Sequence, residues 1–241
     1  MAWRHGAAPT AGAPVAALSR LREGCYRLFS QSLLYPQEER LRGLALAVNE
    51  LARRGRRSHL ASCYPGWREI LRAVEALASE EIAPLQSQYI REFYSTCEGG
   101  CSLWESSYIG ENASAQSHLL AQLAKEYAQA GVTPSPYGDE SRDHAAVELE
   151  FMVYLCSMEA EAWEQEDLIS ALEALRQESG FLERHLTGYF IKVGRSVADC
   201  SSCDSYRCVI ATAADFVLYD LDLLKALLRR FQSYTLPSDV P

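Results

Sequence analysis

Apolar residues recur along most of the chain at intervals of three and four residues, the spacing that places side chains on one face of an α-helix. The first such stripe runs from Leu18 to Leu33, and Pro36 ends it. A second helix is predicted over about 37–53, and Pro65 marks the start of a third. The first part of the chain is therefore predicted to be helical throughout.

The same pattern continues to the end of the chain. Pro84 starts another helix through the segment LQSQYIREFYSTC, and Ser114 is expected to cap a helix that Gly131 ends. No alternating run of β-branched residues indicates a strand, and no segment repeats. The pattern predicts an all-α, single-domain bundle of about nine helices, the later ones over about 143–164, 167–177, 181–197 and 206–231.

The first fourteen residues differ in composition from the rest of the chain. Residues 1–14 are rich in Ala, Gly and Pro and are interpreted as a flexible tail, because the prolines interrupt what would be the apolar part of a secretory signal. Residues 15–241 are expected to form one helical domain. No apolar run is long enough to predict a membrane span.

The charge balance narrows the class of partner. Asp and Glu total 32 against 23 Lys and Arg, so the net charge is −9. An acidic surface repels phosphate backbones, so no nucleic acid partner is expected, whereas a basic partner such as an arginine-bearing peptide is favoured. Without an evident secretory signal the protein is expected to be cytoplasmic, and its eight cysteines are then thiols or metal ligands before they are disulfides.

Asp143 and His144 stand side by side at the start of a long apolar stretch. Such a pair can be a catalytic dyad, half of a metal site, a helix cap or part of a recognition surface. The sequence contains no metalloprotease histidine spacing, no glycine-rich phosphate loop and no G-x-S-x-G elbow, so we do not expect an enzyme. By spacing alone Asp143 is expected to be the helix N-cap, with His144 half-exposed in the first turn.

The cysteines suggest a second kind of chemistry. CEGGC supplies Cys97 and Cys101, and DCSSCDSYRC supplies Cys200, Cys203 and Cys208 in what is expected to be one loop. Closely spaced thiolates from two loops can hold a zinc ion tetrahedrally if the loops meet. The alternative is that all five are free thiols in polar loops. Small core residues are expected at the remaining three positions, Cys25, Cys63 and Cys156.

Three segments in order resemble the TorD/DmsD family of redox-enzyme maturation chaperones. They are YIREF at 89–93, CSLWESSYIGE at 101–111 and DESRDHAAVELEFM at 139–152. GFLERHLTGYF at 180–190 and the final helix, with Tyr206 near its start, are similar to the family's last helices. The resemblance covers nearly the whole chain beyond the tail.

The resemblance implies a cytoplasmic chaperone with an all-α fold that needs no cofactor, present as a monomer or a helix-swapped homodimer. Its partners would be the twin-arginine leader peptide and the apo-form of a molybdopterin oxidoreductase of the dimethyl-sulfoxide-reductase type. Carboxylates can pair with the leader's guanidinium groups, and aromatic rings can cover its apolar part. The residues expected to bind this peptide are Tyr89, Phe93, Trp104, Glu105, Ser106, Tyr108, Asp143, His144 and Glu148.

The chain departs from the family pattern at two places. Ser141 stands where the family usually has a proline, and the segment before Trp104 carries Cys97 and Cys101 in place of a proline-rich stretch. These departures leave an alternative function open, a cysteine-ligated, metal-binding redox or sensor protein on a helical scaffold.

Overall fold

A computed structural model of the chain describes residues 12–57, 64, 66–94, 101–110, 112–133, 141–200 and 204–232. These residues contain helices and no strand, which confirms the predicted all-α fold. The nine α-helices within the described ranges are α1 (Gly12–Ser32), α2 (Glu38–Arg57), α3 (Trp67–Ala78), α4 (Ile82–Phe93), α5 (Ala113–Gln129), α6 (Ala145–Glu164), α7 (Leu168–Phe181), α8 (Thr187–Cys200) and α9 (Asp204–Gln232). A 3-10 helix, η2 (Glu105–Tyr108), and a π-helical segment, η3 (Leu182–Leu186), complete the described elements.

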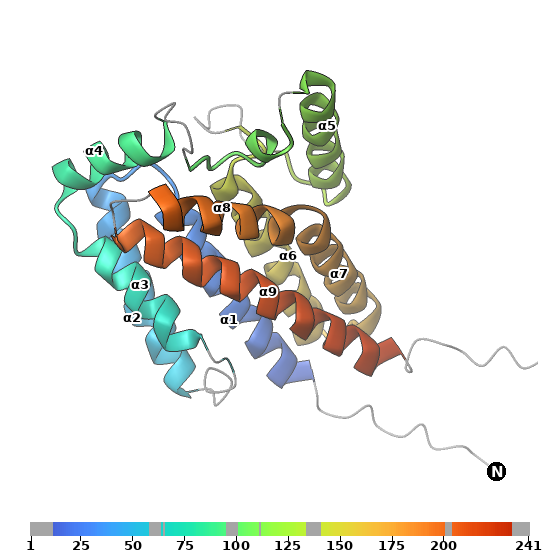
Figure 1. Cartoon of the computed structure of the whole chain (residues 1–241). Coiled ribbons are helices and arrows are strands. Elements are labelled where there is room, and N and C mark those ends of the chain that lie inside the picture. Colours follow the sequence, from blue (N-terminus) through green and yellow to red (C-terminus); the bar gives the residue numbers. More distant parts are fainter. Residues whose placement is uncertain are drawn as a thin grey trace, which may run out of the picture.

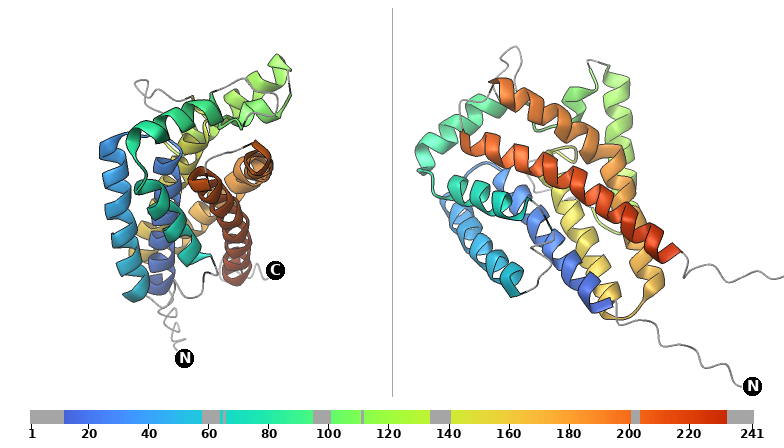
Figure 2. Two further views of the ribbon diagram at one scale, coloured as in Figure 1. Left: turned by 60° about the vertical axis from the view of Figure 1, so that its left-hand side comes forward. Right: turned by 60° about the horizontal axis from the view of Figure 1, so that its bottom comes forward.

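The helices surround a central antiparallel pair, α1 and α6 (Figure 1). Helix α9 lies across this pair, with α2 and α3 on one side and α7 and α8 on the other, while α4 and η2 cross the upper end and α5 stands beside them (Figure 2). The apolar stripe of α1 gives the core Cys25, Leu28 and Phe29, and Leu33 is buried just past the end of the helix. The central position of α1 follows from this wide buried face.

A buried ion-pair network joins four of these helices. The guanidinium of Arg22 on α1 donates to Glu159 on α6 at 2.6 Å, to Asp220 on α9 at 2.5 Å and to Glu178 on α7. The hydroxyl of Tyr26 also donates to Asp220, at 2.6 Å. Burial raises the pKa of Glu178 to about 8, although the adjacent Arg22 opposes this shift. Three carboxylates around one buried cation make Arg22 the electrostatic centre of the bundle.

The bounds of several helices differ from those predicted. Helix α1 begins at Gly12, so residues 12–14 of the expected tail are helical. Asn112, and not Ser114, caps α5: its side chain accepts hydrogen bonds from the N–H groups of Ser114 at 3.0 Å and Ala115 at 3.2 Å. Gly131 follows α5 with a φ of 78°, the left-handed conformation expected at a helix end.

The two predicted helices over about 167–177 and 181–197 are one helical run. Helix α7 passes through η3 directly into α8. Gly180 does not break it but allows a close contact, since a Cβ atom there would lie 2.8 Å from Nη1 of Arg184. The π-helical segment changes the direction of the side chains that follow, and it turns His185 into the protein.

None of the helices among the described residues is long and apolar enough to cross a membrane.

Candidate functional site

The two segments that carried most of the predicted site meet at the upper end of the bundle. Residues 101–110 lie against the start of α6 through an isolated antiparallel bridge between Trp104 and His144. The N–H of Glu105 donates to the carbonyl of Asp143 at 2.9 Å, and the N–H of Ala145 donates to the carbonyl of Leu103 at 2.7 Å. This pairing brings together residues about forty positions apart in the chain and holds η2 over α6.

The N-cap of α6 is His144, not Asp143 as predicted. Nδ1 of His144 accepts a hydrogen bond from the N–H of Ala146 at 3.2 Å, and the side chain is buried. The prediction of a half-exposed His144 was therefore also wrong. The bridge to Trp104 places His144 at the capping position, and the indole of Trp104 packs edge-on against its ring at 5.0 Å.

The Asp143 side chain instead forms a hydrogen bond with η2. Its Oδ2 accepts a hydrogen bond from the N–H of Ser106 at 3.3 Å, and the hydroxyl of Ser141 donates to Oδ1. Burial lowers the pKa of His144 to about 4, although the charge of Asp143 opposes this shift, so the imidazole is neutral near pH 7. Because Nδ1 of His144 accepts the N–H of Ala146, this nitrogen carries no proton and cannot donate to Asp143, as it would have to in the His–Asp pair of a catalytic triad.

A cluster of carboxylates lies beneath this segment. Glu148 of α6 is fully buried, and its carboxyl group lies close to that of Glu105. Burial, followed by the nearby charges of Glu105 and Asp143, raises the pKa of Glu148 well above its usual range. The environment of Glu148 therefore favours the protonated, neutral form of its side chain.

His185 links two of these carboxylates. Its Nδ1 lies 3.0 Å from Oε2 of Glu105, and its Nε2 lies 3.4 Å from Oε1 of Glu126 on α5. Burial alone would lower the pKa of His185, but the hydrogen bonds to Glu105 and Glu126 outweigh it and raise the pKa. At Glu126 burial acts in the opposite direction and favours a raised pKa, but the hydrogen bonds from His185 and Arg184 outweigh it and lower the pKa to about 2.

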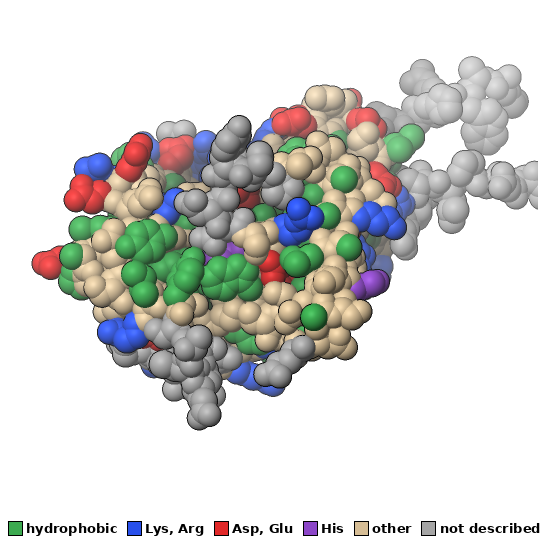
Figure 3. All heavy atoms as spheres, turned by 90° about the horizontal axis from the view of Figure 1, so that it is seen from above, with side chains coloured by type: hydrophobic (Ala, Val, Ile, Leu, Met, Phe, Trp, Pro, Cys, Tyr) green, Lys and Arg blue, Asp and Glu red, His purple; other side chains and the backbone are tan. Residues whose placement is uncertain are grey.

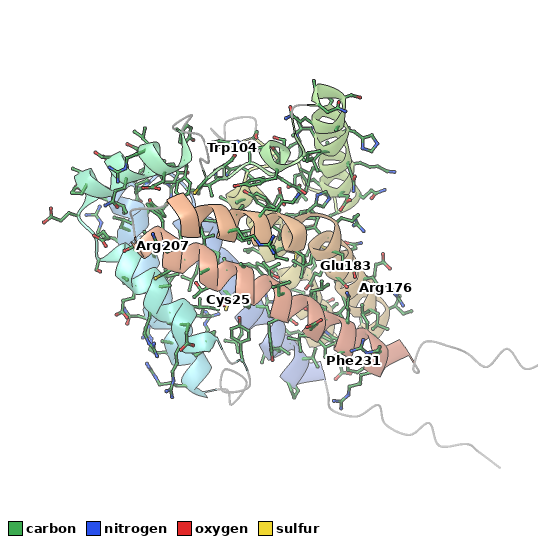
Figure 4. All side chains as sticks on the ribbon, in the orientation of Figure 1. Cys25, Trp104, Arg176, Glu183, Arg207 and Phe231 are labelled. Atoms are coloured by element: carbon green, nitrogen blue, oxygen red, sulfur yellow. The ribbon has the colours of Figure 1, made fainter. Side chains whose placement is uncertain are left out.

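An exposed apolar surface lies above the cluster. It is formed by Ile90 and Tyr94, which are 51% and 50% exposed, and by the half-buried Trp104, and we call these three residues the Trp104 platform. The rings of Tyr94 and Trp104 pack edge-to-face at 5.2 Å. Seen from above, hydrophobic side chains form a band across the middle of this face (Figure 3). Figure 4 places Trp104 at the top of the molecule, above α8.

The structure separates the predicted peptide-binding residues into two groups. Trp104, Ser106 and Tyr108 are partly exposed. Tyr89 is buried, and its hydroxyl donates to the carbonyl of Leu33 at 2.9 Å, while Phe93 packs against Tyr206 at 5.2 Å. The buried group as a whole is Tyr89, Phe93, Glu105, Asp143, His144 and Glu148.

Four residues of this region are not among those predicted from the sequence. Ile90 of α4 and Tyr94, the C-cap of that helix, stand four residues apart, which is itself a helical spacing. Both are exposed, whereas their neighbours Tyr89 and Phe93 are buried. The sequence carried no sign that Glu126 and His185 would meet Glu105, because they are distant in the chain.

The five cysteines of the predicted metal site are only partly described. Cys101 is buried, and Cys208 is exposed in the second turn of α9. Cys200 is the last residue of α8, so the three C-terminal cysteines do not share one loop as predicted, because the buried stripe of α9 begins as early as Ser205 and Tyr206. Cys97, Cys203 and the Cys200 side chain lie outside the described residues. Within the described ranges no group of three or more His, Cys, Asp or Glu side chains is placed to hold a metal ion.

Comparison with known proteins gives two findings. A family model described as nitrate reductase delta subunit matches residues 60–193, which is more than half of the chain. A solved structure from Archaeoglobus fulgidus, described as a proposed redox enzyme maturation protein, shares 20% identity and superposes with a TM-score of 0.48 over 81% of this chain and 93% of that chain. No curated protein matches the sequence.

Proposed function

This chain belongs to the nitrate reductase delta subunit family of redox enzyme maturation chaperones, and we propose that it binds the twin-arginine leader peptide of a molybdopterin oxidoreductase. The client would be an apo-enzyme of the dimethyl-sulfoxide-reductase type, held in the cytoplasm until its cofactor is inserted and then released for export or assembly. The chaperone would act as a monomer or homodimer and would need no cofactor of its own.

The observation that carries the proposal is the Trp104 platform beside a group of acidic side chains. Exposed aromatic side chains that already pack against each other bind an apolar partner with little further loss of conformational entropy. Tyr and Trp are also the residues most often found at the energetic centre of an interface. The apolar stretch that follows the two arginines of a leader would lie on Ile90, Tyr94 and Trp104.

The arginines would bind at the edge of the acidic cluster. Asp143 and Glu148 are buried, whereas the side chains of Glu105 and Glu126 are 11% and 15% exposed. Glu126 is bound on its outer side by the half-exposed Arg184, through two bonds of 2.9 Å. A leader guanidinium would replace Arg184 on Glu126 with the same bidentate geometry. The buried Asp143, His144 and Glu148 would then support the binding surface and not touch the peptide.

A fluorescence-anisotropy titration with a labelled synthetic twin-arginine leader tests this function. The platform variants Trp104→Ala and Tyr94→Ala should weaken binding by more than about tenfold, because truncating a hot-spot aromatic costs about 2 kcal/mol or more. Ile169→Ala is the matched control, since Ile169 is 79% exposed on α7, away from the platform. A leader with both arginines changed to lysine should also bind more weakly.

Two results would overturn the proposal. One is a wild-type protein that binds the leader no better than a scrambled peptide. The other is a Trp104→Ala variant that keeps full affinity while its circular dichroism spectrum shows a folded protein.

A further inference from the structure

A narrow cavity lies on another part of the molecule, between α1, α3 and α9. Its volume is about 90 Å³. Figure 4 labels Cys25, one of the lining residues, near the middle of α9 and well below Trp104. The cavity is therefore separate from the Trp104 platform. It is lined by Leu18, Leu21, Arg22, Cys25, Tyr64, Trp67, Phe216, Tyr219, Asp220 and Leu223.

The walls of this cavity are almost entirely apolar. The charged atoms at its inner end belong to Arg22 and Asp220, which are bound to each other and to other buried groups. The hydrogen-bonding atoms of Arg22 and Asp220 thus already have partners within the protein and are not offered to a ligand. An apolar cavity of roughly 150 Å³ admits a benzene ring, so this smaller one suits one aliphatic side chain.

The mouth of the cavity is open on its apolar side. Leu18, Trp67 and Leu223 are only half-buried, and the rings of Tyr64 and Tyr219 pack edge-to-face at 4.6 Å. Partly exposed residues of this size around one opening are typical of a contact surface and not of a closed core.

An acidic hollow continues outward from the two tyrosines. It is lined by Tyr64, Gly66, Glu69, Thr212, Asp215 and Tyr219. Asp215 is exposed and forms no ion pair with any described residue, and Glu69 meets only the exposed Arg72, at 3.6 Å. Two carboxylates thus flank the mouth without a strongly bound cation.

We propose that this surface, the α3–α9 groove, binds a partner protein segment that inserts one aliphatic side chain into the cavity and sets a lysine or arginine against Asp215 and Glu69. The occupant follows from two complementary features: the cavity volume selects an aliphatic side chain, and the acidic rim selects a cation and repels an acidic segment. Binding here is independent of leader binding at the Trp104 platform.

The tryptophans allow the two surfaces to be observed separately. Trp67 lines the groove and Trp104 lies on the platform, so each surface has its own indole N–H signal in the NMR spectrum of ¹⁵N-labelled protein. The variants Trp67→Phe and Trp104→Phe assign the two signals. The probe is a synthetic amphipathic helical peptide of leucine and lysine. It should shift the Trp67 signal at lower concentration than that of Trp104. A peptide with serine for leucine, and one with glutamate for lysine, should leave Trp67 unshifted.

The rim charges provide the variant test. Asp215→Asn combined with Glu69→Gln should weaken probe binding at Trp67 by about two- to fivefold, the effect of exposed charge pairs. Glu150→Gln, an exposed carboxylate on α6, is the control and should leave the affinity unchanged. An unshifted Trp67 signal, or equal affinity for the rim variant and the control, would overturn the inference. Failure of a leader peptide to shift Trp104 would instead count against the proposed function alone.

Discussion

Nδ1 of His185 lies 3.0 Å from Oε2 of Glu105, which joins the π-helical segment between α7 and α8 to the 3-10 helix that follows Trp104. The second ring nitrogen lies 3.4 Å from Glu126 on α5. One imidazole thus connects three elements around the candidate peptide-binding surface. Its protonation determines how strongly those elements are held together.

The His185 contacts predict a pH-dependent stability. Because the pKa of His185 is raised in the folded protein, its contribution is fully present below the ordinary value of 6.5 and is lost as the pH rises through the folded value. His185→Gln should therefore lower the free energy of unfolding more at pH 6 than at pH 8.5. Urea unfolding at the two pH values measures this, with exposed His118→Gln as control. An equal loss at both pH values would show that His185 acts only by packing.

The burial of Glu148 predicts that folding stability depends on pH, and that a neutral side chain at this position removes this dependence. Its folded pKa is raised, so its contribution to stability is present below the ordinary value of 4.5 and is lost as the pH rises toward the folded value. Glu148→Gln should match the wild type near pH 4.5 and be more stable at pH 8. The exposed neighbour Glu150→Gln should behave as the wild type at both pH values. Thermal unfolding at pH 4.5 and 8 tests this, and a Glu148→Gln protein less stable at pH 8 would contradict it.

Replacement of Arg22 is predicted to cause a large loss of folding stability. Arg22→Met leaves Glu159, Glu178 and Asp220 close together without their shared cation, and removing one partner of a buried ion pair costs about 3–5 kcal/mol. Arg27→Met, on the same helix, is the control. It removes only a surface ion pair with Glu23 and should cost less than about 1 kcal/mol. Urea unfolding of both variants gives the comparison. Similar losses would mean that the network adds little to packing.

Asp143 predicts a local effect on η2. Asp143→Ala removes the acceptor of the Ser106 N–H bond, at a cost of about 1–3 kcal/mol for the donor left unpaired. Ser141→Ala removes one donor to Asp143 but keeps the bond to Ser106, so it should cost less. Urea unfolding gives the two costs, and the Trp104 indole N–H signal should move further in Asp143→Ala. Equal costs and an unmoved Trp104 signal would show that the Asp143–Ser106 bond does not hold η2.

The sequence by itself determined the helices, because their signals are local. Apolar spacing marks the buried face of α1, and Pro36 lies in the turn that follows this helix. The resemblance carried by the segments around Trp104 and Asp143 was likewise sufficient to identify the family, which the family model confirms.

Tertiary structure decided which side chains of the site are accessible. Asp143 and His144 are both able to cap a helix, and the bridge from His144 to Trp104, a contact distant in sequence, assigned the cap to His144 and directed Asp143 to Ser106. Burial of Glu148 arises in the same way, because η2 covers α6 only once residues 101–110 have paired with the start of that helix. Helical spacing determines the direction in which a side chain leaves the axis of its helix. Which other element packs there determines whether that side chain contacts water, a peptide or another side chain.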